Sequence, residues 1–71
     1  MTPLDAFQAA LGGEHAAVYV YGVLGGRASR DPNAALRTKI NEAYDLHRAR
    51  RDQLIALISA RQAVPANYTL S

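Results

Sequence analysis

The sequence predicts an all-α protein: one domain built as an antiparallel hairpin of two long helices. Alanine is the commonest of its 71 residues, and only five glycines and three prolines interrupt the chain. Alanine is the strongest helix former, whereas glycine and proline are the weakest. Two signals typical of helix starts each precede a long segment in which apolar residues recur at steps of three and four, the spacing of one helix face.

The first helix is expected over residues 3–25. Thr2 is a preferred N-cap residue, and Pro3 suits the first helical position because its missing N–H would have no partner there. Asp5 stands three residues after the cap, where a carboxylate can complete a capping box and faces the positive end of the helix dipole. The Gly25-Gly26 pair predicts the end, since glycine readily adopts the left-handed conformation that closes many helices.

The second helix is expected over residues 32–62. Asp31 followed by Pro32 repeats the start signal, a capping side chain and then proline at the first helical position. No helix breaker follows until Pro65, which forces the residue before it into an extended conformation. Residues 63–71 have no helical period, so we expect an extended tail that needs a surface to lie on.

The Gly12-Gly13 pair is the one local contradiction within the first helix, because glycine costs about 1 kcal/mol relative to alanine there. One interpretation is a kink. The other, which we favour, is close packing. Together with the surrounding alanines, these glycines leave two faces of the helix small enough for a neighbouring backbone to approach closely.

Each expected helix carries one stripe of residues at alternating steps of three and four, the spacing of a seam between packed helices. The stripe of the first helix is Leu4, Phe7, Leu11, Glu14, Val18, Tyr21 and Gly25. The stripe of the second is Leu36, Ile40, Ala43, His47, Arg50, Leu54 and Leu57, and a neighbouring row adds Tyr44, Arg51 and Ile58. Both stripes are apolar at their ends and polar in the middle. In an antiparallel hairpin these polar middles should meet.

The meeting of the two polar middles suggests two kinds of site. The first is a buried structural layer of hydrogen bonds and ion pairs, which can fix the register of a bundle at some cost in stability. Its members would be Glu14, His47 and either Arg50 or Arg51. The second is a metal site in which Glu14 and His47 of two chains hold Fe, Mn or Zn, because carboxylate and imidazole are ordinary ligands of these metals.

We favour the structural layer and expect no cofactor, for two reasons. Di-iron bundles use Glu-x-x-His motifs, and the second helix contains none. The neighbouring arginines would also repel a cation.

Composition excludes several function classes. The absence of cysteine rules out disulfides, thiolate metal sites and cysteine nucleophiles. No nucleophile, base and orienting group stand together, and no glycine-rich loop opens a helix, so the sequence points to no enzymatic reaction. The net charge of +2 is small, the arginines between residues 48 and 61 wrap around the helix, and no aromatic residue stands between them for base stacking. Binding to nucleic acid is therefore a weaker hypothesis.

The chain shows no sign of export or membrane insertion. Its first residues form no basic segment followed by a long apolar stretch, as a secretory signal would. The longest uncharged apolar run, residues 16–26, is shorter than the roughly 20 residues of a membrane span. We therefore expect a soluble, cytoplasmic protein with no membrane partner.

Three stretches stand out from the alanine-rich remainder of the chain: EHAAVYVYGVLG at residues 14–25, HRARRDQL at residues 47–54 and ANYTL at residues 66–70. Together they resemble the uncharacterised ferritin-like domain family of actinobacteria, and the similarity spans nearly the whole chain. The resemblance implies a ferritin-like four-helix bundle, of which this chain supplies the first helical hairpin. The family has no established activity to carry over.

The size of the chain favours self-association. For 71 residues without disulfides, the free energy gained by apolar burial roughly balances the lost conformational entropy. A hairpin with two apolar faces also needs further helices to cover them. We therefore expect a structural or interaction module whose partner is a second copy, so that a homodimer or higher oligomer completes the four-helix bundle across a two-fold axis. The alternative is a piece of a longer four-helix domain.

Overall fold

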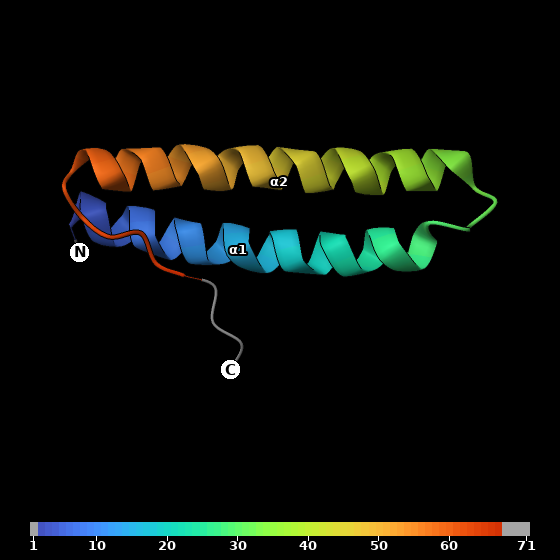
Figure 1. The fold of residues 1–71 in the computed structure, drawn as a ribbon, viewed down its shortest axis with the longest axis horizontal. Coiled ribbons are helices and arrows are strands. Elements are labelled where there is room, and N and C mark those ends of the chain that lie inside the picture. The colour runs from blue at the N-terminus through green and yellow to red at the C-terminus, as the bar shows by residue number, and fades with distance from the viewer. Residues whose placement is uncertain (1, 68–71) are drawn as a thin grey trace.

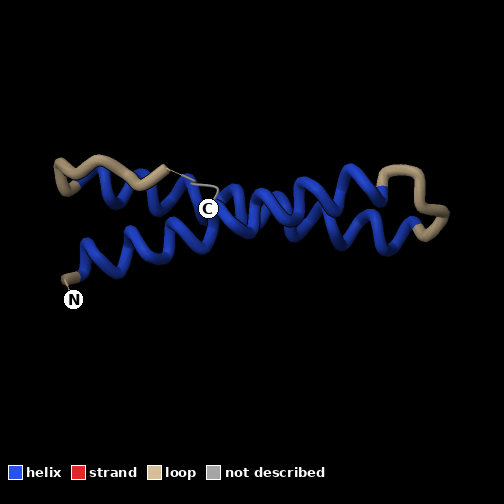
Figure 2. The backbone as a smooth tube through the Cα atoms, turned by 90° about the horizontal axis from the view of Figure 1, so that it is seen from below, coloured by secondary structure: helices blue, strands red, loops and turns tan. Residues whose placement is uncertain are grey.

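The structure is a computed structural model that describes residues 2–67, and it is an antiparallel hairpin of two α-helices (Figure 1). α1 spans Pro3–Ala28 and α2 spans Ala34–Ala60. The two helices run alongside each other in Figure 1 and cross near mid-length in the perpendicular view of Figure 2. The segment after α2 folds back along the first half of α1. The prediction of an all-α hairpin is confirmed.

α1 begins with the predicted capping box. The backbone N–H of Asp5 donates to the Thr2 hydroxyl over 3.1 Å, and the backbone N–H of Thr2 donates to the Asp5 carboxylate over 3.1 Å. Two of the backbone donors that a helix start leaves without partners are thereby satisfied. Because the Thr2 backbone N–H, and then its side chain, hydrogen-bond the carboxylate, the pKa of Asp5 lies below its ordinary value of 3.8.

Replacing Asp5 by alanine is expected to lower the free energy of unfolding at neutral pH and to have no such effect in strong acid. The folded-state pKa of Asp5 is lowered, so its contribution is present above the unfolded pKa and is lost as the pH falls through the folded value. Urea unfolding of the unchanged protein and the Asp5→Ala variant between pH 2 and 7 measures the gap between their free energies of unfolding. A gap that stays constant over this range would contradict the assignment.

The end of α1 differs from the prediction. The helix continues through Gly25 and Gly26 to Ala28, and no glycine among the described residues has a positive φ. Gly25 instead lies against α2, where a Cβ would come 3.7 Å from the Ile40 side chain. Ser29 closes the helix, with its hydroxyl donating to the Gly26 carbonyl over 2.8 Å. The prediction that Gly25-Gly26 ends the helix is wrong, because packing against α2 and the Ser29 cap together extend the last turn.

α2 starts at Ala34, two residues after the predicted start, because Asn33 and not Asp31 is the N-cap. The Asn33 side chain accepts from the backbone N–H of Leu36 over 3.0 Å. Asp31 has a different role: its carboxylate accepts from the Asn33 backbone N–H over 2.8 Å and so holds the loop in shape. Pro32 consequently remains outside the helix.

α2 ends at Ala60, before the predicted position. Gln62 adopts a left-handed conformation with φ of 57°, and its backbone N–H donates to the Ser59 carbonyl over 2.9 Å. The Arg61 guanidinium lies over the Phe7 ring, 4.7 Å from its centroid, and this cation–π contact ties the end of α2 to the first turns of α1. The chain then continues as the extended tail that the sequence predicts, of which residues 68–71 lie outside the described part.

The core between the helices is thin. Among the described residues only Leu11 and Ile58 are fully buried. All seven residues of the α1 stripe are buried or half-buried, as expected. On α2 the buried face is rotated toward the neighbouring row of Tyr44, Arg51 and Ile58. The reason is that Gly22 of α1 leaves room for the Tyr44 ring: a Cβ at Gly22 would lie 3.5 Å from Tyr44 Cε2. Four members of the predicted α2 stripe are half-buried, and the other three are exposed: Leu36, Arg50 and Leu57.

The Gly12-Gly13 pair lies on the solvent side of α1. The helix is continuous through both residues, and a Cβ at either position would meet no atom within 4 Å. The expectation of a close backbone approach at these glycines is therefore not met within the hairpin. Close contact with α2 occurs farther along, at Gly22 and Gly25. Neither helix in the described part of the chain is long and apolar enough to cross a membrane.

Candidate functional site

A polar pair stands where the two helices pass each other at mid-length. His47 Nδ1 of α2 lies 2.6 Å from Glu14 Oε2 of α1. The His47 side chain is 22% exposed and that of Glu14 is 17% exposed. A carboxylate only accepts hydrogen bonds, so Nδ1 carries the proton and donates it. Both residues belong to the inward faces of their helices, and the contact joins the middles of the two stripes.

The imidazole of His47 is fixed by a second contact. The Tyr21 ring stacks on it with centroids 5.4 Å apart and an angle of 12° between the planes. An edge contact with Glu14 and a face contact with Tyr21 together leave the ring one orientation. The other ring nitrogen, Nε2, makes no hydrogen bond with residues 2–67.

The two arginines expected in this layer do not contact Glu14. Arg50 is exposed, because α2 is rotated toward the neighbouring row. Arg51 is half-buried, but its Nε and Nη2 atoms lie 3.1 Å from the carboxylate of Asp52. Arg48, on the same part of α2, lies over the Tyr44 ring at 5.4 Å from its centroid. The polar layer of the hairpin is thus Glu14 and His47, with Tyr21 above the imidazole.

A double-mutant cycle on the pair is expected to give a coupling energy of about 1 kcal/mol, between the values typical of exposed ion pairs and of buried hydrogen-bonded charges. The cycle compares Glu14→Ala, His47→Ala and the double variant in urea unfolding at pH 7. Arg50→Ala serves as the control, since Arg50 is exposed and should show no coupling to Glu14. Additive effects of the two site variants would contradict a stabilising contact.

A second polar contact, which the sequence analysis missed, binds the extended tail to α1. The Gln8 side-chain amide donates to the Val64 carbonyl over 2.8 Å, and its Oε1 accepts from the Ala66 backbone N–H over 2.8 Å. This is the way a neighbouring β-strand would pair with the segment. His15 Nε2 lies 2.9 Å from the Ala66 carbonyl and, facing an acceptor, donates to it.

The tail therefore covers one flank of α1, beside the flank covered by α2 (Figure 1). Gln8 and His15 are both half-buried. The sequence contains two weak signals for this contact. Gln8 and His15 flank the α1 stripe on the same side, and the tail has no helical period. Which side chains would hold such a tail depends on the direction in which it leaves α2, and Gln62 sets that direction.

Within residues 2–67, no group of three or more histidine, aspartate or glutamate side chains could hold a metal ion. Glu14 and His47 are two ligand-bearing residues of one chain, so a site with more protein ligands would need a second copy.

Comparison with known proteins places the chain in a family. No curated protein and no solved structure is significantly similar to it. The family described as domain of unknown function (DUF4439) matches residues 6–70. That range includes both helices except for the first turn of α1. The chain therefore belongs to the DUF4439 family.

Proposed function

We propose that this protein is a self-association module: two copies pair through the outer face of α1 and form a homodimer of four helices, with the two α1 helices in contact at its centre and the α2 helices on the outside. The single observation that carries the proposal is the apolar character of α1 on the face that neither α2 nor the tail covers. A helix that is apolar all round is normally buried on all sides.

The charge distribution along α1 supports this proposal. Between Ala6 and Gly26 the only charged side chain is Glu14, which bonds to α2, and His15 bonds to the tail. The residues opposite α2 are small or apolar and exposed: Ala9, Gly13, Ala16, Val20 and Val23. Val20 is 50% exposed and Leu24, at the edge of the same face, is 42% exposed. We call this set, with Leu24, the outer face of α1.

A second copy fits this face better than an unrelated partner of opposite charge. In a two-fold contact the same surface of both copies meets, with residue i contacting j and j contacting i, so a face of one charge sign would oppose like charges. The outer face of α1 carries none. The far side of α2, by contrast, carries Asp45, Arg48 and Asp52, all exposed, and is suited to face water. The small residues Gly13 and Ala16 would let the two α1 backbones approach closely.

In such a dimer the contact between Glu14 and His47 has a structural role. It fixes the register of α1 against α2 within each hairpin, and thereby the position of Val20 and Leu24 on the outer face. A polar contact at one level of an otherwise apolar seam is a common way to select one register among several.

Sedimentation equilibrium of the purified protein tests the proposal. The expected result is a particle of twice the 7.7 kDa chain mass, with a helical circular dichroism spectrum that is lost together with the dimer on dilution. A stably folded monomer at micromolar concentration would overturn it.

One observation favours a second candidate, metal binding by Glu14 and His47 of two chains. His47 Nε2 makes no hydrogen bond with the described residues, and its Nδ1–H is held by a carboxylate, an arrangement that orients many metal-binding histidines. Elemental analysis of the protein, and melting curves with added Fe, Mn or Zn, decide between the candidates. Bound metal that is lost in Glu14→Ala would support this candidate, and no metal together with unchanged melting would remove it.

A further inference from the structure

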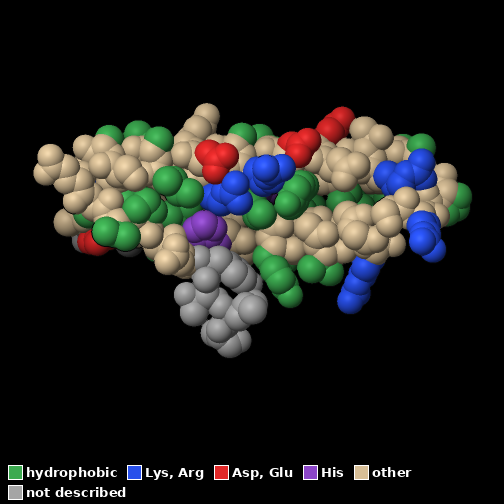
Figure 3. Space-filling view, in the orientation of Figure 1, with side chains coloured by type: hydrophobic (Ala, Val, Ile, Leu, Met, Phe, Trp, Pro, Cys, Tyr) green, Lys and Arg blue, Asp and Glu red, His purple; other side chains and the backbone are tan. Residues whose placement is uncertain are grey.

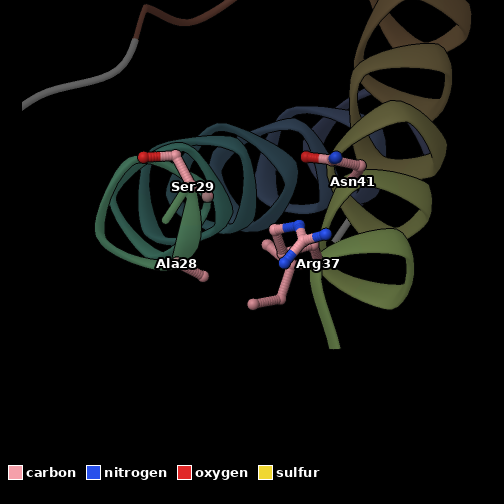
Figure 4. Close-up of a pocket in the computed structure, with 6 residues that line it drawn as sticks. Ala28, Ser29, Arg37 and Asn41 are labelled. Carbon is pink, nitrogen blue, oxygen red and sulfur yellow. The ribbon is translucent and has the colours of Figure 1, made fainter. Parts of the chain in front are cut away.

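A cavity of about 280 Å³ lies at the loop end of the hairpin, away from the outer face and from the Glu14 and His47 pair. Its lining comes from the last turn of α1 and the first turns of α2: Gly25, Ala28, Ser29, Arg37, Ile40 and Asn41. In Figure 4 the Arg37 guanidinium lies between the two helices, Asn41 stands on α2 beside it, and Ser29 stands on α1 with its hydroxyl turned away from Asn41.

Arg37 is a half-buried cation without a carboxylate partner. One guanidinium nitrogen donates to the backbone carbonyl of Asp31, which is a neutral group. Among residues 2–67, no acidic side chain lies within ion-pair distance of Arg37, and the Asp31 carboxylate is bound to the Asn33 N–H instead. A partly buried charge that lacks a counter-ion is unfavourable, and its remaining N–H groups are free to bind an anion.

The neighbouring polar groups complement Arg37. The Asn41 side chain makes no hydrogen bond with the described residues, so its amide, whose Oδ1 lies toward Gly25, can turn its NH₂ group to an acceptor at no loss of a bond. Residues 27–42 carry four cations against two carboxylates, so this end of the hairpin has a net positive charge: Arg27, Arg30, Arg37 and Lys39 against Asp31 and Glu42. On the face shown in Figure 3, the Lys and Arg side chains at this end have no acidic neighbours, whereas those near the middle of α2 do.

The remaining lining is apolar. Ile40 and Ala28 contribute aliphatic side chains, and Gly25 contributes no side chain at all. A free inorganic ion would leave this part of the cavity without a partner, whereas a short hydrocarbon group would fill it.

We propose that this cavity binds a small organic carboxylate. The carboxylate accepts hydrogen bonds from the Arg37 guanidinium and the Asn41 amide, and its short aliphatic part lies against Ile40 and Ala28. The site is formed by one hairpin and is independent of the proposed dimer.

Nuclear magnetic resonance titration of the ¹⁵N-labelled chain with butyrate, and separately with inorganic phosphate, tests the proposal in low-chloride buffer. Saturable shifts of the Arg37 Nε–H and Asn41 NH₂ signals are expected with butyrate, at lower ligand concentrations than with phosphate. The absence of saturation, or binding of phosphate as tight as that of butyrate, would overturn the assignment.

Three variants locate the site. Arg37→Met should weaken butyrate binding about tenfold, the loss expected for one charge-assisted hydrogen bond. Arg30→Met is the matched control, since this exposed arginine lies in the same loop end, carries the same charge and does not line the cavity. Gly25→Ala keeps every charge and places a methyl group on the cavity wall at ordinary contact distances of 3.7 and 3.8 Å from its neighbours, so the chain should fold and binding should weaken.

Equal weakening by Arg37→Met and Arg30→Met would show general attraction to a positive surface and would overturn a specific site. Unchanged binding in Gly25→Ala would exclude this cavity as the place where butyrate binds.

Discussion

A chain carrying Val20→Glu is expected to be a monomer under conditions in which the unchanged protein is a dimer. Val20 is 50% exposed in the single hairpin and lies near the centre of the outer face of α1. In a two-fold contact the glutamates of both copies would enter the apolar interface together, and each would lose its hydration without a partner. Such uncompensated burial costs several kcal/mol per charge. Every 1.4 kcal/mol weakens association tenfold.

Multi-angle light scattering across a range of protein concentrations measures this effect, and circular dichroism reports whether the hairpin itself remains folded. The matched control is Val64→Glu, which makes the same change at a residue that is 85% exposed on the tail. This control should remain a dimer. If both variants associate like the unchanged protein, the outer face of α1 is not the contact surface and the proposed dimer is wrong.

The parts of the fold that could be predicted from the sequence depend on local interactions. The capping box of Thr2 and Asp5 is formed by residues three positions apart, so their identities alone specify it. The α1 stripe was predictable for a similar reason, since the helical period assigns a face to every residue once the helix exists. All seven of its members face inward.

The helix ends required information from across the hairpin. Gly25 has the residue type of a helix stop, but α2 packs against it and Ser29 supplies the cap. At the second start, Asp31 and Asn33 are both good capping residues, and the loop conformation decides between them. The sequence contains no local signal for that choice.

The sequence predicted the polar middle of the hairpin only in part, because the face of α2 that it assigned to the core is rotated from the one that is buried. The stripes predicted only that the polar middles of the two helices meet, and the structure brings Glu14 and His47 to 2.6 Å. The α2 stripe also included Arg50, which the structure leaves exposed, because the packing of Tyr44 against Gly22 turns α2 toward its neighbouring row. The rotation of α2 about its own axis depends on the packing of side chains from both helices, so the residue pattern of one helix does not predict it.

Leu11→Ala is expected to destabilise the protein more than any other truncation of an α1 side chain. Leu11 and Ile58 are the two fully buried side chains among the described residues, and each has 0% exposure. Removing a buried leucine side chain costs about 2–5 kcal/mol, which includes the cavity that remains. Small domains have only about 5 kcal/mol of stability in total, so the variant should be largely unfolded or should melt at least roughly 10 °C lower.

Leu36→Ala tests whether burial is the cause, because it removes the same atoms from a leucine that is 42% exposed. Its expected cost is less than half that of Leu11→Ala, since the area returned to water is smaller and no closed cavity forms. Thermal unfolding must be compared at equal protein concentration, because dimer formation would raise the melting temperature of any chain by mass action. If the two leucines cost the same, surfaces outside the single hairpin bury Leu36 as well, and the α2 stripe predicted from the sequence would then describe the assembled bundle better than the isolated chain.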